Sequence, residues 1–314
     1  MGEELVRVTT VGLCGSDRHW FVQGSVGDAV VSRPLVLGHE ISGVIASGPR
    51  RGERVAVDPA DPCGRCDQCT AGLAHLCRDL RFLGHGTTDG GLRTLMPWPG
   101  RLLMPIPEHI DNDAAALLEP LGVALHAIDL AKIRRGTTAG VFGCGPIGLL
   151  LIQVLRQKGA AFVLATDPLD HRRDAAALAG ADDVRRPVAG NAGHVSDPPA
   201  WPAMDVAFEV AGTDGALDDA MTAVKPGARV VLVGIPDSDA TTFRASTARH
   251  KGLSLLLSRR MVGSDLARAA ALAETGQVDL GSLITARYPL ERTADAFTSL
   301  ARRDGLKVVI EASN

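Results

Sequence analysis

In the middle of the chain, short apolar segments typical of buried strands alternate with longer segments typical of helices. From residue 138 the sequence reads TAGVFGCGPIGLLLIQVLRQKG, which predicts a short buried strand, a glycine turn and an apolar helix. AFVLATD, MDVAFEVAG and ARVVLVGIP are further predicted strands, and HRRDAAALAG and GALDDAMTAV are predicted helices between them. Strands that alternate with helices indicate an α/β fold with a doubly wound parallel sheet.

A second domain is predicted on both sides of this region. The chain has 314 residues, which is more than one typical core accommodates. We place the outer domain at residues 1–122 and 259–314, and the alternating sheet at residues 123–258. The last part contains LITARYPLERTADAFTSL and GLKVVI, which predict a strand, a helix and a final strand. The stretch RRPVAGNAGHVSDPPAWPAM is rich in proline and glycine and is predicted to be a surface loop.

Composition and charge exclude several classes of protein. Hydrophobic residues make up 46% of the chain, charged residues 22%, and the net charge is −3, so no basic surface for nucleic acid or anionic membrane is expected. No apolar run approaches the roughly 20 residues that span a bilayer. The opening MGEELVRVTT has early acidic residues and lacks the apolar region of a signal peptide. We therefore expect a cytoplasmic protein whose thiols stay reduced.

Four of the six cysteines lie within one short stretch, PCGRCDQCTAGLAHLC. In a reduced compartment such clustering indicates metal ligands rather than disulfides. Zinc prefers a tetrahedral set of thiolates, and a site closed by four of them is structural because it leaves no open position. We therefore predict a zinc lobe at residues 62–78, against the alternative of unrelated thiols or a redox pair. Its ligands are Cys63, Cys66, Cys69 and Cys77.

Residues suited to a second, open metal site are spread along the chain. Cys14 lies in VGLCGSDRHW, His39 and Glu40 lie in PLVLGHEISG, and Glu119 lies in LLEPLGVALHA. A catalytic zinc takes about three protein ligands of mixed type and leaves one position for water or substrate. Glu119 would be a further ligand or would hold the zinc-bound water. Taken singly, such a cysteine or histidine is more often an ordinary buried or hydrogen-bonded residue.

The glycine turn after the first predicted strand indicates a dinucleotide site. Gly143, Gly145 and Gly148 form GxGxxG at a strand-to-helix junction, where backbone and helix N-terminus can approach a pyrophosphate. Asp167 ends the next strand and would accept hydrogen bonds from the adenosine ribose, which favours NAD over NADP. The alternative for Asp167 is a helix N-cap. Arg172 tempers the preference, because arginine can also meet a 2′-phosphate. Pro146 and Ile147, within the same turn, are assigned to the cofactor site.

These motifs together resemble a known family. CGSDRHW, PLVLGHE, the four-cysteine stretch and GCGPIG are similar to the zinc-dependent medium-chain dehydrogenases. The longer run CGSDRHWFVQGSVGDAVVSRPLVLGHE most resembles the polyol branch, which comprises sorbitol, L-iditol and xylitol dehydrogenases, and LEPLGVALHA and GLKVVI support that branch. The resemblance extends from about Leu5 to Ile310.

The resemblance implies a GroES-like, β-rich catalytic domain and a Rossmann nucleotide domain. It implies NAD, two zinc ions per chain, and a homotetramer or homodimer. The implied roles are Cys14, His39 and Glu40 as ligands of the catalytic zinc, Glu119 as the acidic group beside it, Cys63, Cys66, Cys69 and Cys77 as ligands of the structural zinc, and Val233, Gly234 and Ile235 as neighbours of the nicotinamide.

The expected reaction is oxidation of a secondary alcohol, a polyol, to a ketone with NAD. Zinc would lower the pKa of the substrate hydroxyl. Ser16 would hydrogen-bond that oxygen, the proton would leave through the cofactor ribose to His19, and Asp17 would hold the far nitrogen of His39. Alternatively, Ser16, Asp17 and His19 are turn residues without a chemical role. The rival activities are an L-threonine 3-dehydrogenase or other amino-alcohol dehydrogenase, and a noncatalytic nucleotide-binding relative.

The chain departs from the family pattern in three places. It begins within what resembles a complete domain, so we expect the sheet edge or apolar patch near Val6 to Val11 to lie uncovered, either because the natural chain is longer or because an oligomer contact hides it. The loop in IASGPRRGERV is shorter than usual. Trp20 stands where polyol dehydrogenases often have tyrosine, which leaves the identity of the sugar alcohol open.

Overall fold

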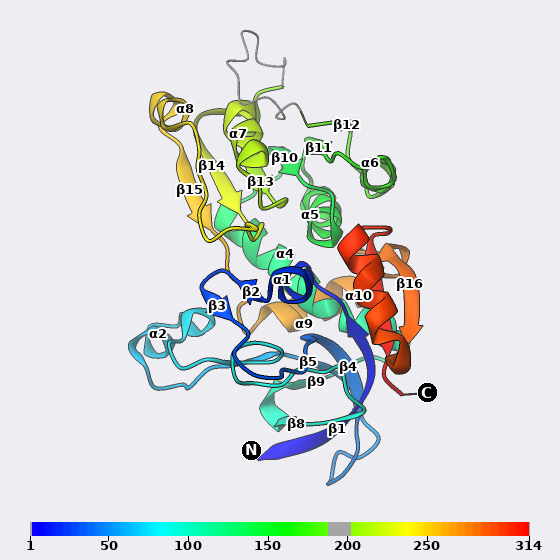
Figure 1. The fold of residues 1–314 in the computed structure, drawn as a ribbon. Coiled ribbons are helices and arrows are strands. Elements are labelled where there is room, and N and C mark those ends of the chain that lie inside the picture. Colours follow the sequence, from blue (N-terminus) through cyan, green and yellow to red (C-terminus); the bar gives the residue numbers. More distant parts are fainter. Residues whose placement is uncertain (1, 188–201, 314) are drawn as a thin grey trace. The chain divides into compact units, whose positions relative to one another are not determined.

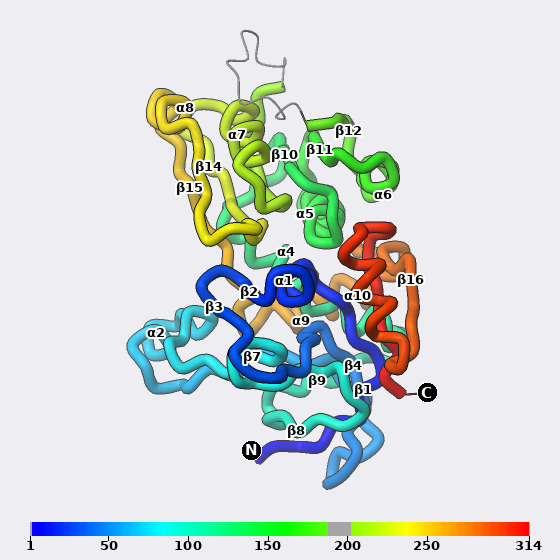
Figure 2. Tube along the Cα trace, in the orientation of Figure 1, coloured from blue at the N-terminus to red at the C-terminus, as the bar shows by residue number. Residues whose placement is uncertain are grey.

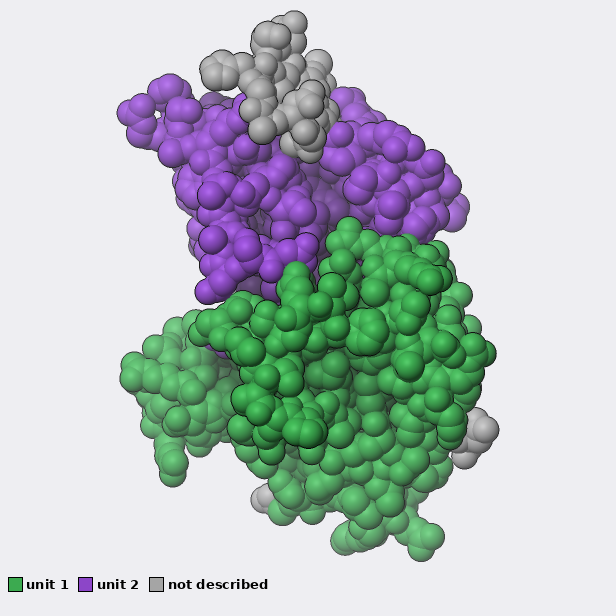
Figure 3. Space-filling model, in the orientation of Figure 1, with its two compact units in different colours: residues 1–123, 260–314 green, residues 124–259 purple. Residues whose placement is uncertain are grey.

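The protein divides into two compact units. The computed structural model describes residues 2–187 and 202–313, and it places residues 1–123 and 260–314 in the first unit and residues 124–259 in the second (Figure 3). Each boundary lies one residue from the predicted one. Most of the predicted proline- and glycine-rich loop, residues 188–201, lies outside the described residues.

The first unit is built on a seven-stranded sheet with the order β16-β17-β1-β4-β5-β9, in which β8 also pairs with β1 (Figure 1). All of its pairs are antiparallel except β16 with β17. Strands that lie side by side in this sheet are often far apart in the chain, because the C-terminal strands β16 and β17 complete the sheet beside β1. The strands are β1 (Glu3–Gly12), β4 (Glu40–Ile45), β5 (Arg54–Val57), β8 (Leu95–Pro99), β9 (Leu103–Pro105), β16 (Ile284–Pro289) and β17 (Lys307–Glu311).

Strand β1 lies inside this sheet, so the expectation of an uncovered edge near Val6 to Val11 is wrong. It pairs with β4 along residues 6–12, and on its other side with β8 at residues 3–7 and with β17 at residues 10–12 (Figure 2). Val6, Val8 and Val11 are fully buried in the core of the unit. The edge is covered because the partner strands β8 and β17 come from distant parts of the chain, which the local sequence near Val6 does not reveal.

Short helices and two-stranded ribbons surround the sheet of the first unit. Helix α1 begins after Cys14, whose backbone N–H donates to the Asp17 carboxylate at 2.9 Å, as in a capped helix start. Helix α10 packs against α1, β16 and β17. The remaining elements are α1 (Gly15–Gln23), β2 (Ser25–Val26), β3 (Ala29–Val30), β6 (Ala60–Asp61), α2 (Asp67–Thr70), η1 (Ala74–Leu76), β7 (Arg81–Phe82), η2 (Gly100–Leu102), α3 (Asn112–Ala116), α9 (Asp265–Glu274), η3 (Gly281–Leu283), η4 (Leu290–Arg292) and α10 (Thr293–Arg302).

The second unit contains the predicted parallel sheet, with the strand order β12-β11-β10-β13-β14-β15. The chain moves outward from β10 in one direction and then in the other, so a topological switch point lies beside β10, where such folds bind ligands. Helix α4 begins in the first unit. The elements are α4 (Leu118–Ala131), β10 (Thr138–Phe142), α5 (Pro146–Gln157), β11 (Phe162–Thr166), α6 (Asp170–Leu178), β12 (Asp183–Arg185), β13 (Met204–Glu209), α7 (Asp214–Ala223), β14 (Val224–Leu232), α8 (Ala245–Lys251) and β15 (Ser254–Leu257).

The doubly wound α/β fold predicted for this region is therefore confirmed. Among the helices of residues 2–187 and 202–313, none combines the length and apolar character that a membrane span requires.

Candidate metal and cofactor sites

The four clustered cysteines form a set that fits a tetrahedral metal. Their sulfur atoms all lie within 4.8 Å of one another, and Cys66 Sγ is 3.5 Å from Cys69 Sγ and 3.8 Å from Cys77 Sγ. Four thiolates at the usual Zn–S distance of about 2.3 Å would be separated by about 3.8 Å. The backbone N–H groups of Cys69 and Arg78 lower the pKa of Cys66 to about 6, which favours its thiolate. Desolvation raises the pKa of Cys69 to about 12 and also raises that of Cys77, so zinc binding would have to displace those protons.

A second set of possible ligands lies at the start of β4. One ligand atom each of Cys14, His39 and Glu40 lies within the same 4.8 Å limit, although these residues come from different segments. Cys14 precedes α1, while His39 and Glu40 are buried at the entry to β4. Sulfur, nitrogen and oxygen donors of this kind suit zinc. The structure thus brings together the three residues that the sequence resemblance had grouped.

Buried charges surround His39. Burial opposes its protonation, but Asp17, the Cys14 sulfur and Glu119 together raise the pKa of His39 well above its usual value. Asp17 Oδ1 lies 3.7 Å from His39 Nδ1, and Asp17 Oδ2 accepts the Cys14 N–H. Asp17 therefore lies beside the imidazole, but its Oδ1 makes no hydrogen bond to it at this distance, so the holding role stays a prediction. Such a concentration of negative charge also suits a bound cation.

Sequence reasoning missed Lys307, the partner of Glu40. Lys307 Nζ lies 2.7 Å from both Glu40 carboxylate oxygens and donates to the Leu13 carbonyl at 3.0 Å. Lys307 is only 2% exposed, so this ion pair is shielded from water. Glu40 would therefore have to share its carboxylate between Lys307 and a metal. The signal in the sequence was the lysine that opens the otherwise apolar strand KVVI.

Glu119 lies near this charge cluster but outside the compact three-residue set. It is buried at the start of α4. Burial raises the pKa of Glu119 to about 7, His39 lowers it, and Glu40 raises it further. Because His39 and Glu119 influence each other's pKa, the two side chains act within one electrostatic environment. Glu119 thus remains available as the acidic group that was predicted beside the metal.

The other predicted catalytic residues lie on α1. Ser16 is half-buried in the first turn, and His19 is buried with its Nδ1 at 3.1 Å from Gln23 Oε1. Trp20 is buried and makes an edge-to-face contact with His85, with ring centroids 5.4 Å apart. Ser16 and His19 therefore lie in the helix that begins directly after Cys14.

In the second unit, Asp167 connects the glycine turn to the next loop. Its Oδ2 accepts the Cys144 N–H and its Oδ1 accepts the Leu169 N–H, each at 2.9 Å. Helix α6 begins at Asp170 with Leu169 as its N-cap, so the alternative interpretation of Asp167 as an N-cap is wrong. Arg172 Nη1 lies 3.9 Å from Asp167 Oδ2 and also approaches Gly145. The predicted cofactor residues around this turn are thus gathered at the carboxyl ends of β10 and β11.

Two glycines make this turn possible. Gly143 has a φ of +112°, a conformation that residues with a Cβ rarely adopt. A Cβ at Gly148 would overlap the Gly143 carbonyl. Gly145 is the N-cap of α5, and Pro146, which has no N–H, opens the helix before Ile147. The backbone N–H groups that follow Pro146 in this first turn suit a phosphate.

Glu209 organises the loops near Val233, Gly234 and Ile235, and sequence reasoning missed it. Its Oε1 accepts the N–H groups of Ala211 at 2.8 Å and Gly212 at 2.7 Å. Its carbonyl accepts the N–H groups of Val233 at 2.8 Å and Gly234 at 3.1 Å. Burial raises the pKa of Glu209 to about 7. The available signal was a carboxylate at the end of the apolar strand MDVAFE.

Fold and sites together define a two-unit, nucleotide-dependent oxidoreductase with metal-ligand sets in its β-rich unit. Residues 1–108 match the alcohol dehydrogenase GroES-like domain, and residues 146–275 match the zinc-binding dehydrogenase family. The chain is also similar to the sorbitol dehydrogenase of Bacillus subtilis, with 31% identity over 98% of this chain and 90% of that protein. The protein belongs to the zinc-dependent medium-chain dehydrogenases, as its sequence motifs predicted.

Solved structures of similar proteins hold nicotinamide cofactors. A zinc-binding dehydrogenase of Sinorhizobium meliloti bound to NADP has 30% identity and a TM-score of 0.87, over 99% of this chain and 92% of that one. An alcohol dehydrogenase of Escherichia coli complexed with NADH has 28% identity and a TM-score of 0.87, over the same shares of the two chains. Both of these similar structures therefore hold a nicotinamide dinucleotide.

Proposed function

We propose that the protein oxidises a secondary hydroxyl of a polyol to a ketone and passes the hydride to NAD. The observation that carries the proposal is the compact set of Cys14, His39 and Glu40, in which His39 and Glu40 are buried and Cys14 is half-buried, with Glu119 in the same electrostatic environment. The similarity to a sorbitol dehydrogenase supports the choice of a polyol.

Two zinc ions per chain are part of the proposal. One would be held by Cys63, Cys66, Cys69 and Cys77, and the other by Cys14, His39 and Glu40. At the second site zinc would supply the Lewis acidity that lowers the pKa of the substrate hydroxyl.

The protein's own side chains then have separate duties. Asp17 holds the imidazole of His39 in place, and Lys307 balances the charge of Glu40. Ser16 would hydrogen-bond the substrate oxygen, and His19 would pass the released proton on toward solvent. Glu119 accepts a hydrogen bond from a second hydroxyl of the polyol, or from water. Each polar side chain around Cys14 thus has a proposed function in binding or proton transfer.

The proposed preference for NAD rests on Asp167. Its carboxylate lies at the carboxyl end of β11, where it would repel a 2′-phosphate and accept hydrogen bonds from ribose hydroxyls. Arg172, 3.9 Å away, offsets part of that charge. We therefore expect a preference for NAD that is moderate rather than absolute.

Steady-state assays test this function. Sorbitol, xylitol and L-iditol, a plain secondary alcohol and L-threonine are each supplied with NAD and with NADP, and nicotinamide absorbance is followed. We expect the highest kcat/KM for a polyol with NAD. A higher value for L-threonine would favour the rival amino-alcohol dehydrogenase, and absence of turnover with every substrate would favour a noncatalytic nucleotide-binding relative.

Glu119 allows a sharper test of the polyol assignment. Glu119→Ala should lower kcat/KM for the preferred polyol more than for the plain secondary alcohol, because only the polyol offers a second oxygen. The ratio of the two losses is the measurement. Equal losses for both substrates would remove the reason for choosing a polyol.

The proposal also covers location and assembly. We infer a cytoplasmic enzyme with a small-molecule substrate, no nucleic-acid or membrane partner, and a homodimeric or homotetrameric state. Two features support this: no disulfide joins any of the six cysteines, and the edge strand β15 exposes Leu257 by 79%. Size-exclusion chromatography with light scattering measures the oligomeric state.

A further inference from the structure

The four-cysteine lobe is joined to the rest of its unit by a narrow ribbon. Strands β6 and β7 pair antiparallel, with Ala60 opposite Phe82 and Asp61 opposite Arg81. The four cysteines all lie in the segment between these strands. Along the chain, the lobe is therefore connected to the rest of the unit through these two short strands.

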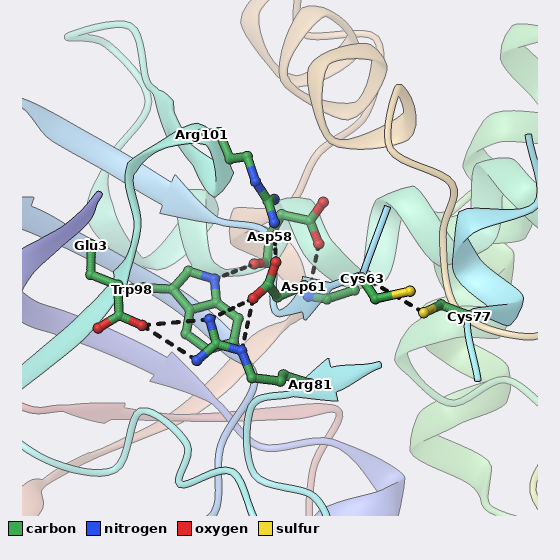
Figure 4. A network of polar contacts seen from close by, with 9 residues as sticks. Glu3, Asp58, Asp61, Cys63, Cys77, Arg81, Trp98 and Arg101 are labelled. Atoms are coloured by element: carbon green, nitrogen blue, oxygen red, sulfur yellow. Dashed lines mark hydrogen bonds and ion pairs between the residues drawn. The ribbon is translucent and has the colours of Figure 1, made fainter. Parts of the chain in front are cut away.

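Asp61 fixes this ribbon to the sheet. Its Oδ2 accepts from Arg81 Nε at 2.8 Å and Nη2 at 2.5 Å, and its Oδ1 accepts from Arg101 (Figure 4). Arg81 also reaches Glu3 of β1 at 3.3 Å and lies over the Trp98 ring. Asp61 is buried, whereas the side chains of Arg81 and Arg101 are 50% and 44% exposed, so removal of Asp61 would break both pairs and leave the two guanidinium groups to water. The ribbon would then lose its polar link to Arg101 of η2, while Arg81 would keep its contact with Glu3 of β1.

Phe82, which follows Arg81 in β7, contacts the proposed catalytic metal site through His39. Its ring centroid is 5.4 Å from that of His39, with a tilt of 48°. Two residues later, a Cβ at Gly84 would stand only 3.0 Å from the Gly38 backbone nitrogen, so the chain after Phe82 packs tightly on the segment before His39. Strand β7 thus contacts both the anchor at Asp61 and the imidazole at His39.

We propose that Asp61 and Phe82 are positioning residues through which the four-cysteine lobe fixes the orientation of His39. On this account the lobe contributes to catalysis as well as to stability, because His39 must present its ring nitrogen to the metal within a narrow range of angles. The inference rests on the proposed function only in taking Cys14 and His39 as metal ligands. It adds that the two metal sites are coupled through β7.

The experiment replaces the metal at the Cys14 and His39 site with Co²⁺, whose visible absorption depends on ligand geometry. Wild type is compared with Asp61→Asn and Phe82→Leu. The matched control is Asp67→Asn, because Asp67 also pairs with an arginine, Arg78, but does so on the exposed surface of the lobe. Zinc content, NAD affinity, melting temperature and alcohol kinetics are measured for each protein.

We expect Asp61→Asn and Phe82→Leu to shift the cobalt absorption and to lower kcat/KM for the alcohol by about tenfold, the loss typical of residues that support metal ligands. NAD affinity should stay unchanged, and Asp67→Asn should behave as wild type. A lower melting temperature in Asp61→Asn with wild-type absorption and kcat/KM would show that the lobe only stabilises, and would overturn the proposal. If Asp61→Asn does not fold, the same comparison on Phe82→Leu decides.

The cobalt spectrum needs no substrate, so it separates this inference from the proposed function. A wild-type protein with a normal cobalt spectrum but no alcohol turnover would refute the function and leave the coupling to be judged by the spectra alone. A protein that binds no cobalt at Cys14 and His39 would overturn both.

Discussion

At the scale of single residues, this protein contains buried charged side chains that have ion-pair or hydrogen-bond partners within their own unit. Lys307 and Glu40 form a closed pair, and Asp61 joins two arginines. Glu209 instead relies on backbone N–H groups. Burial of such groups is unfavourable unless each finds its partner, so removal of one member should be felt more strongly than removal of both.

Lys307 provides the clearest case. Lys307→Met should lower the free energy of unfolding by about 3–5 kcal/mol, because it leaves Glu40 buried without its counter-charge. The double variant Lys307→Met with Glu40→Gln should recover part of that loss. Urea denaturation of the three proteins measures both effects. Equal stability of the single and double variants would contradict a direct pairing.

Glu209 should make stability depend on pH. Its folded pKa of about 7 lies above its usual value of 4.5, so its favourable contribution is complete below pH 4.5 and is lost as pH rises through 7. Relative to Glu209→Gln, the wild type should lose at most about 3 kcal/mol over that range. Denaturation at several pH values measures the difference. Glu274→Gln, at an exposed glutamate, is the control, and a parallel pH profile for Glu209→Gln and wild type would refute the account.

At the scale of elements, the β10–α5 junction depends on glycine for two separate reasons. A side chain at Gly148 would collide with the Gly143 carbonyl, whereas a side chain at Gly145 meets only Arg172 at 3.6 Å. Gly148 is therefore required for the fold of the turn itself. Gly145 instead leaves open the space that a bound pyrophosphate would occupy.

This distinction predicts different outcomes for two similar changes. Gly148→Ala should lower the melting temperature and weaken NAD binding together. Gly145→Ala should keep the melting temperature of the wild type and still weaken NAD binding, because the added methyl enters only the cofactor's space. Thermal unfolding without cofactor and fluorescence titration with NADH make the comparison. Normal NADH affinity in Gly145→Ala would show that the turn does not approach the cofactor.

At the scale of the whole molecule, sequence pattern predicted what is local and missed what joins distant segments. The α/β alternation and the glycine turn were predictable because each is encoded within one short stretch. The covered edge of β1 was not, since β8 and β17 come from other parts of the chain. The pair of Glu40 with Lys307, separated by 267 positions, likewise depends on the folded sheet.

The central claim is that Cys14 belongs to a catalytic metal site distinct from the four-cysteine lobe. Metal analysis of purified wild type and Cys14→Ser, combined with alcohol turnover, tests it most directly. Cys66→Ser serves as the matched control in the lobe. We predict that Cys14→Ser loses one of two zinc ions and all turnover while keeping the wild-type melting temperature, whereas Cys66→Ser melts lower. Full zinc content and normal turnover in Cys14→Ser would contradict the account.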